Sequence, residues 1–141
     1  GYTPNGGSDD LRAEIAAMYG PQIKAENVIV FPGAQVALQV AAFALTDRHS
    51  HSIVFNPAYQ STQEAPVHAG SQVTRIELRA SNSWQVDPRE VEAAIQKNTR
   101  YMVLNEPYNP AGTLMSPKLQ MELTAIAERC RAQLPAESAW K

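Results

Sequence analysis

Short apolar segments and helix-spaced apolar positions alternate along the chain. Four segments rich in β-branched or aromatic residues are typical of strands, and they cover residues 28–31, 52–55, 73–78 and 101–104. Between them, apolar residues recur three or four positions apart, a spacing that places them on one face of a helix. Strands that alternate with helices of about a dozen residues indicate right-handed crossovers and a mostly parallel sheet. The sequence therefore predicts the α/β fold class.

The signals at the ends of the predicted helices agree with this pattern. Ser8 can cap a helix in which Asp9 and Asp10 complement the positive end of the helix dipole. Asp87 precedes Pro88, which suits the first position of a helix. Further helices are expected over residues 36–45, which are apolar nearly all round and should be buried, over residues 61–68, and from residue 117 onward.

Composition narrows the class of protein. The chain has 141 residues, 44% hydrophobic and 18% charged, which is enough for one ordinary core. A net charge of -2 without a basic stripe argues against nucleic acid and a membrane surface as partners. A single cysteine, no long apolar segment and no signal-like start favour the cytoplasm. The chain starts at Gly1 without an initiator methionine, and we expect a fragment.

The turn after the first predicted strand leads directly into a helix. In Pro32-Gly33-Ala34-Gln35, free backbone N–H groups and the positive end of the helix dipole would face outward, as an anion site requires. The alternative is a plain strand-to-helix turn, because a single glycine near a helix start is weak evidence. The glycine patterns of phosphate loops and dinucleotide folds are both absent.

Two other turns would emerge at the same edge of a parallel sheet, where open α/β sheets bind ligands. Tyr59 follows Asn56-Pro57-Ala58 and is either core filler or a stacking platform for a flat heterocycle. Asn109 lies in the constrained segment that Asn105 begins and Gly112 ends, which is either an ordinary surface loop or a rigid mount for an amide. An anion site, a ring and a rigid amide on one edge match a flat phosphorylated ring.

These residues resemble the class I/II aminotransferases, fold-type I enzymes that use pyridoxal 5'-phosphate. The resemblance covers residues 2 to about 131 and rests on four motifs in order. The motifs are Tyr2-Thr3-Pro4-Asn5-Gly6-Gly7 with Leu11-Arg12, Pro32-Gly33-Ala34-Gln35, Asn56-Pro57-Ala58-Tyr59, and Asn105-x-Pro107-x-Asn109-Pro110-Ala111-Gly112. The resemblance implies a three-layer α/β/α fold in which residues 1–133 form the N-terminal half of the cofactor-binding large domain. Residues 134–141 are expected to be a tail without clear structure.

The resemblance also implies roles for individual residues. Gly33, Ala34 and Gln35 would bind the cofactor phosphate, and the Tyr59 ring would stack on the pyridine ring. Asn109 would hydrogen-bond the 3'-oxygen of the cofactor, with Asn105 also counted among the cofactor-binding residues. Tyr2 would reach the phosphate bound by a neighbouring subunit, which implies a homodimer. The Asn56-Pro57 and Asn109-Pro110 bonds are expected to be cis.

Several parts of the family pattern are missing or changed. Ala111 replaces the usual threonine. The Schiff-base lysine, the aspartate at the pyridine nitrogen and a nearby tyrosine cannot be placed in the chain, Lys141 has no matching context, and no catalytic residue is assigned. We therefore expect the chain alone to be inactive and to fold poorly, because strands of the family's sheet are missing.

The function implied is amino-group transfer between an amino acid and a 2-oxo acid in the intact enzyme, with a biosynthetic role. One alternative is a lyase, cyclase or synthase on the same scaffold, because the residues present hold the cofactor and do not select the reaction. Another is an inactive, truncated α/β binding module.

The remaining reactive side chains suggest no further site. His49, His51 and His68 lack metal-ligand spacing and are interpreted as loop or helix-surface residues, so no metal is predicted. Cys130 shares a helix face with Leu119, Leu123 and Ile126 and is expected to pack there, not to act as a nucleophile.

Overall fold

The computed structural model describes residues 4–132 of the chain. They form two compact units, which divide between Ala37 and Leu38. The predicted phosphate contact of Tyr2 and the predicted tail over residues 134–141 lie outside the described residues.

The first unit contains a short capped helix. Helix α1 spans Asp9–Ala17, and the Ser8 side chain accepts a hydrogen bond from the backbone N–H of Leu11, as the sequence predicted. A 3₁₀ helix, η1, follows at Ala25–Asn27. The acidic residues of the first turn of α1 lie where the helix dipole favours negative charge.

The strand predicted over residues 28–31 is wrong. This segment has no regular secondary structure, and the backbone N–H of Val30 donates to the carbonyl oxygen of Gly6 at 2.9 Å. An apolar run becomes a strand only beside a partner strand, and no strand pairs with these residues in the part of the chain that the structure describes.

The second unit is built on a parallel sheet of three strands in the order β2-β1-β3. Strand β1 spans His51–Asn56, β2 spans Gln72–Glu77 and β3 spans Thr99–Met102. Both neighbours of β1 run parallel to it, with His51 opposite Gln72 on one side and Thr99 on the other. The predicted strands over residues 52–55, 73–78 and 101–104 are thus confirmed within two residues at each end.

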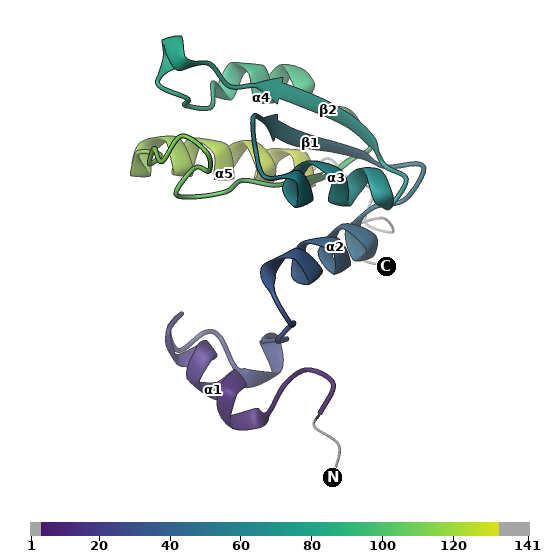
Figure 1. Cartoon of the computed structure of the whole chain (residues 1–141), viewed down its shortest axis with the longest axis vertical. Helices are drawn as coiled ribbons and strands as arrows, with labels where there is room; N and C mark the ends of the chain where they lie inside the picture. Colours follow the sequence, from purple (N-terminus) through teal and green to yellow (C-terminus); the bar gives the residue numbers. More distant parts are fainter. Residues whose placement is uncertain (1–3, 133–141) are drawn as a thin grey trace. The chain divides into compact units, whose positions relative to one another are not determined.

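Helices connect and cover these strands (Figure 1). The predicted helix after Asp87 is confirmed, and it begins at Pro88. Asp87 caps it, because its side chain accepts a hydrogen bond from the N–H of Arg89. The bounds of the helices are Ala34–Leu45 for α2, Gln60–His68 for α3, Ala80–Asn82 for the 3₁₀ helix η2, Pro88–Ala94 for α4 and Pro117–Ala132 for α5.

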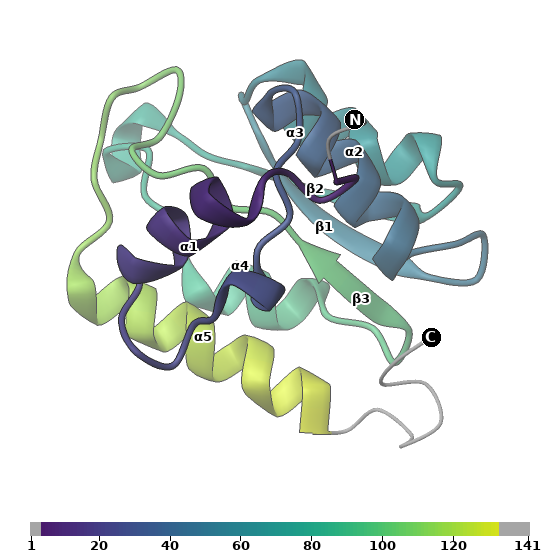
Figure 2. The same ribbon diagram turned by 90° about the horizontal axis from the view of Figure 1, so that it is seen from below.

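Side chains alternate between the two faces of β1 and create two cores. Ile53 and Phe55 join a buried cluster with Val91 of α4 and Leu123 of α5. On the opposite face, helices α2 and α3 pack against β3 through a smaller cluster of Ala42, Ala65 and Tyr101. Figure 2 shows α4 and α5 together on one side of the strands and α3 on the other. The three-layer α/β/α arrangement is therefore confirmed.

The expectation that helix α2 is buried is wrong. Ala42 is its one buried residue, while Val40, Phe43 and Leu45 are exposed. Only the stripe of α2 that faces Ala65 finds a packing partner among the described residues of the second unit. An all-round apolar composition predicts burial only when neighbours exist on every side.

His51 corrects the interpretation of the histidines. His49 and His68 are exposed, as expected, but His51 is buried within β1 with 1% of its surface accessible. No group of histidine, cysteine or acidic residues suited to a metal ion occurs in residues 4–132. None of the helices described there is long and apolar enough to cross a membrane.

Candidate functional site

Two of the three predicted site loops lie at one edge of the sheet. Strands β1 and β3 are parallel, so residues 56–59 and residues 103–113 both leave the sheet at its carboxyl edge. This part of the sequence prediction is confirmed. The residues expected at the phosphate, Gly33, Ala34 and Gln35, belong to the first unit.

The loop after β1 is fixed by side chains that bind its backbone. Its three carbonyl groups at residues 57–59 each accept a hydrogen bond from a side chain, and the Asn56 amide donates to a carboxylate. The partners are Glu77 for Asn56 at 2.7 Å, the Tyr108 hydroxyl for Pro57, Gln63 for Ala58 at 2.9 Å and the Thr62 hydroxyl for Tyr59 at 2.6 Å. These contacts fix the backbone of the loop and leave the Tyr59 side chain free. The Tyr59 ring is 59% exposed, so it is not core filler.

The loop after β3 is closed on itself around Asn109. The N–H of Tyr108 donates to the carbonyl of Thr113 at 2.9 Å, and the N–H of Gly112 donates to the carbonyl of Tyr108 at 2.7 Å. Gly112 has φ of 67°, a conformation that glycine adopts without steric cost. Asn109 is exposed, and its carboxamide has no hydrogen-bond partner within residues 4–132. The segment is thus a rigid mount with a free amide.

Glu106 and Tyr108 anchor this loop from its other side. A carboxylate oxygen of Glu106 accepts the backbone N–H of Met115 at 2.8 Å. Burial, and to a lesser degree the charge of Glu77, raises the pKa of the Tyr108 phenol, so its hydroxyl remains protonated and able to donate.

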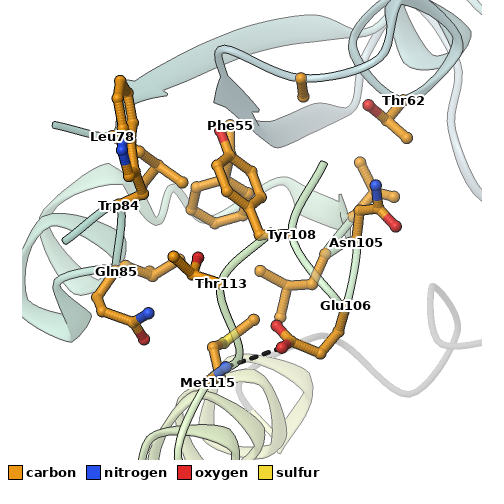
Figure 3. Close-up of a pocket in the computed structure, with 14 residues that line it drawn as sticks. Phe55, Thr62, Leu78, Trp84, Gln85, Asn105, Glu106, Tyr108, Thr113 and Met115 are labelled. Carbon is orange, nitrogen blue, oxygen red and sulfur yellow. Dashed lines mark hydrogen bonds between the residues drawn. The ribbon is translucent and has the colours of Figure 1, made fainter. Parts of the chain in front are cut away.

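Asn105 lines a small cavity to which both loops contribute, through Ala58 and Tyr108 (Figure 3). The cavity measures about 20 Å³, enough for one water molecule and too little for a heterocyclic cofactor. Its walls are mainly apolar and include Phe55, Trp84 and Met115. The exposed Tyr59 and Asn109 side chains are not part of its lining, whereas Asn105 is.

The start of helix α2 offers free backbone donors in the first unit. Gly33 has φ of 106°, which favours glycine, and a Cβ there would meet nothing within 4 Å. No acceptor in the described part of the chain binds the N–H groups of Ala34, Gln35 or Val36. Such unpaired donors at the positive end of a helix dipole suit an anion.

Both peptide bonds expected to be cis are cis, at Asn56-Pro57 and Asn109-Pro110. A third, at Glu106-Pro107, was not foreseen.

The supporting residues escaped sequence reasoning. Tyr108, Glu106, Thr62 and Gln63 lie in or beside the recognised motifs, but each acts through a contact with backbone. The signal available was weak: a tyrosine between two prolines in a loop has no apolar periodicity to explain it, and it proves to be 7% exposed.

A family model described as aminotransferase class I and II matches residues 1–134. The chain belongs to this family. Among similar proteins, the aspartate aminotransferase of Pyrococcus horikoshii is 37% identical over 131 residues, which cover 90% of this chain and 34% of the relative. The arginine–pyruvate transaminase of Pseudomonas aeruginosa is 34% identical, with 93% of this chain and 34% of the relative covered.

Solved aminotransferase structures have the same fold. The aspartate aminotransferase of Thermus thermophilus superposes with a TM-score of 0.87 at 28% identity, covering 92% of this chain and 35% of that chain. A methionine aminotransferase from Escherichia coli gives a TM-score of 0.83 at 32% identity, covering 91% and 35%. The chain spans about a third of the length of these relatives.

Proposed function

We propose that this family member supplies cofactor-binding loops to a pyridoxal-phosphate-dependent aminotransferase, as part of a longer polypeptide. The observation that carries the proposal is Asn109, a carboxamide without a partner in residues 4–132, mounted on a loop whose backbone is fixed. The exposed carboxamide is solvated by water, and the fixed backbone lets a ligand replace that water without reordering the loop, as a preorganised ligand site requires.

The residues present fit the cofactor. Asn109 can donate to the phenolic oxygen of the pyridine ring, and the exposed Tyr59 ring can stack on its face. The unpaired N–H groups at Ala34 and Gln35 suit the phosphate. When bound, pyridoxal phosphate supplies the electron sink for removal of the Cα proton of an amino acid. The chain's own residues bind the ring, fix its plane and hold its charge.

Amino-group transfer between an amino acid and a 2-oxo acid is the reaction that the relatives favour. The similar proteins carry the names of aspartate, arginine–pyruvate and methionine aminotransferases. Lyase, cyclase and synthase chemistry on the same scaffold is the competing possibility, because Tyr59 and Asn109 grip the cofactor and do not select the reaction. We also propose a homodimer in the cytoplasm, with Tyr2 at the neighbouring subunit's phosphate.

Spectroscopy of the full-length protein tests the proposal. With pyridoxal phosphate and an amino acid, transamination should convert the cofactor's visible absorbance to that of the pyridoxamine form, and a 2-oxo acid should restore it. A lyase or synthase would consume the amino acid without accumulating the pyridoxamine form. Failure to bind pyridoxal phosphate at all would contradict the proposal.

A further inference from the structure

The side chain of Tyr108 joins the two loops that carry Tyr59 and Asn109. Its hydroxyl donates a hydrogen bond to the carbonyl oxygen of Pro57, a residue 51 positions away in the sequence. Within the described chain, no other hydrogen bond links residues 56–59 to residues 105–113. The β1–β3 pairing sets the position of the strand ends, and the Tyr108 hydroxyl supplies the direct polar contact between the two loops beyond them.

Tyr108 is itself held firmly at both ends. Its ring is 7% exposed and belongs to the buried cluster that includes Phe55 and Leu123. Its backbone N–H and carbonyl are both used, by Thr113 at 2.9 Å and Gly112 at 2.7 Å. The ring and the backbone of Tyr108 are therefore both fixed, which fixes the position of its hydroxyl. Asn109 is the next residue in the chain.

The accepting loop transmits this restraint to Tyr59. Pro57 lies two residues before Tyr59, and the two carbonyls after it are bound by Gln63 and Thr62. With the backbone fixed at three consecutive carbonyls, a shift of Pro57 would move the Tyr59 ring. The side chains of Tyr59 and Asn109 make no hydrogen bond to each other. The distance between them is therefore set by the backbone of the two loops, which the Thr62 and Tyr108 hydroxyls hold.

We propose that Tyr108 is a positioning residue, which sets the separation of the Tyr59 ring from the Asn109 carboxamide so that both grip one flat cofactor ring. This proposal rests on the proposed function for its ligand. The tie between the loops is a property of the protein without cofactor and can be measured separately.

The test uses Tyr108→Phe in the full-length protein, which removes the hydroxyl and keeps the buried ring. Tyr101→Phe is the matched control, because Tyr101 is also a buried tyrosine, at 8% exposed, but packs in the other cluster with Ala42 and Ala65. For both variants we would measure the dissociation constant of pyridoxal phosphate and the pH midpoint of the bound cofactor's visible absorbance.

We expect Tyr108→Phe to raise the dissociation constant about threefold to tenfold, the loss typical of one hydrogen bond. The pH midpoint should shift in the direction seen for Asn109→Ala. Tyr101→Phe should leave both quantities unchanged. In the double variant of Tyr108→Phe with Asn109→Ala, the tyrosine change should add little further shift, because both act on one contact. Full additivity, or a cofactor spectrum of Tyr108→Phe identical to that of Tyr101→Phe, would overturn the proposal.

Amide hydrogen exchange of the protein without cofactor separates the two proposals. Tyr108→Phe should increase exchange in peptides that cover residues 56–59 and residues 105–113, and Tyr101→Phe should not. If the wild-type protein fails to bind pyridoxal phosphate yet shows this increase, the proposed function fails and the loop tie stands. If exchange in both loops is unchanged by Tyr108→Phe, Tyr108 does not position them.

Discussion

His51 of β1 and Thr99 of β3 lie opposite each other in the sheet, and the Nδ1 atom of His51 lies 2.8 Å from the Thr99 hydroxyl. The other ring nitrogen lies 2.8 Å from the Thr74 hydroxyl of β2. In the neutral imidazole one nitrogen donates and the other accepts, so both hydroxyls can be satisfied. One buried ring thus joins all three strands.

This arrangement makes the stability of the fold depend on pH. Burial lowers the pKa of His51 in the folded chain below its ordinary value of 6.5. At a pH between the folded and the unfolded pKa, the unfolded chain therefore carries a proton on His51 that the folded chain does not. The contribution of His51 is complete above about pH 6.5 and declines as the pH falls through that value. In the full-length protein, we expect His51→Gln to flatten the pH dependence of the free energy of unfolding, measured with denaturant between about pH 8 and about pH 5.

His49→Gln is the matched control, because His49 lies two residues earlier and is exposed. Its pH dependence should follow the wild type. Equal slopes for all three proteins would show that the buried imidazole does not titrate with unfolding.

Leu123 should be essential for the larger core. It is 1% exposed and contacts the cluster between the sheet and the helices α4 and α5. In the full-length protein, Leu123→Ala should lower the free energy of unfolding by about 2–5 kcal/mol, since it removes buried methyl groups and leaves a cavity. Met121→Ala, at a position of the same helix that is 71% exposed, should have little effect in the same denaturant titration. A similar loss of unfolding free energy in Leu123→Ala and Met121→Ala would show that Leu123 is not part of the core.

Glu106 should control the mobility of the loop that carries Asn109. Its carboxylate accepts the Met115 N–H at 2.8 Å, so Glu106→Ala should speed amide exchange at Met115. Glu106→Gln retains an acceptor oxygen and should preserve most of the protection. Nuclear magnetic resonance of the amide distinguishes these results, and equal exchange in Glu106→Ala and the wild type would contradict the assigned role.

Tyr59 should act through its ring and not through its hydroxyl. In the full-length protein, Tyr59→Phe keeps the stacking surface and should bind pyridoxal phosphate nearly as well as the wild type. Tyr59→Leu should raise the dissociation constant roughly twofold to tenfold, the contribution expected of one aromatic pair. A loss in Tyr59→Phe as large as the loss in Tyr59→Leu would indicate a hydrogen bond from the hydroxyl instead of stacking.

Local signals in the sequence were sufficient for much of the fold. Ser8 and Asp87 begin helices through hydrogen bonds to residues two or three positions away, so their effect is visible in a short window. The parallel sheet follows from the order of strands and helices. The apolar run over residues 28–31 has the same local signal as β1, yet it forms no strand, because pairing depends on a partner that local sequence does not reveal.

The candidate site divides in the same way. Tyr59 and Asn109 can be singled out from the sequence because each stands in a proline-containing turn that follows a predicted strand, and their role in binding the cofactor stays a prediction. Tyr108 and His51 could not, since their partners lie 51 and 48 residues away in the sequence. The exposed face of α2 could not be predicted for a related reason. The sequence of a helix shows which of its side chains are apolar, but it does not show which other elements pack against them.

The most direct test is a crystal structure of the full-length protein with pyridoxal phosphate bound. It should place the Asn109 carboxamide nitrogen about 2.7–3.2 Å from the 3'-oxygen of the cofactor, with the Tyr59 ring stacked on the pyridine face. The phosphate should accept hydrogen bonds from the N–H groups of Ala34 and Gln35. A cofactor held elsewhere, with Asn109 and Tyr59 both facing solvent, would contradict the account.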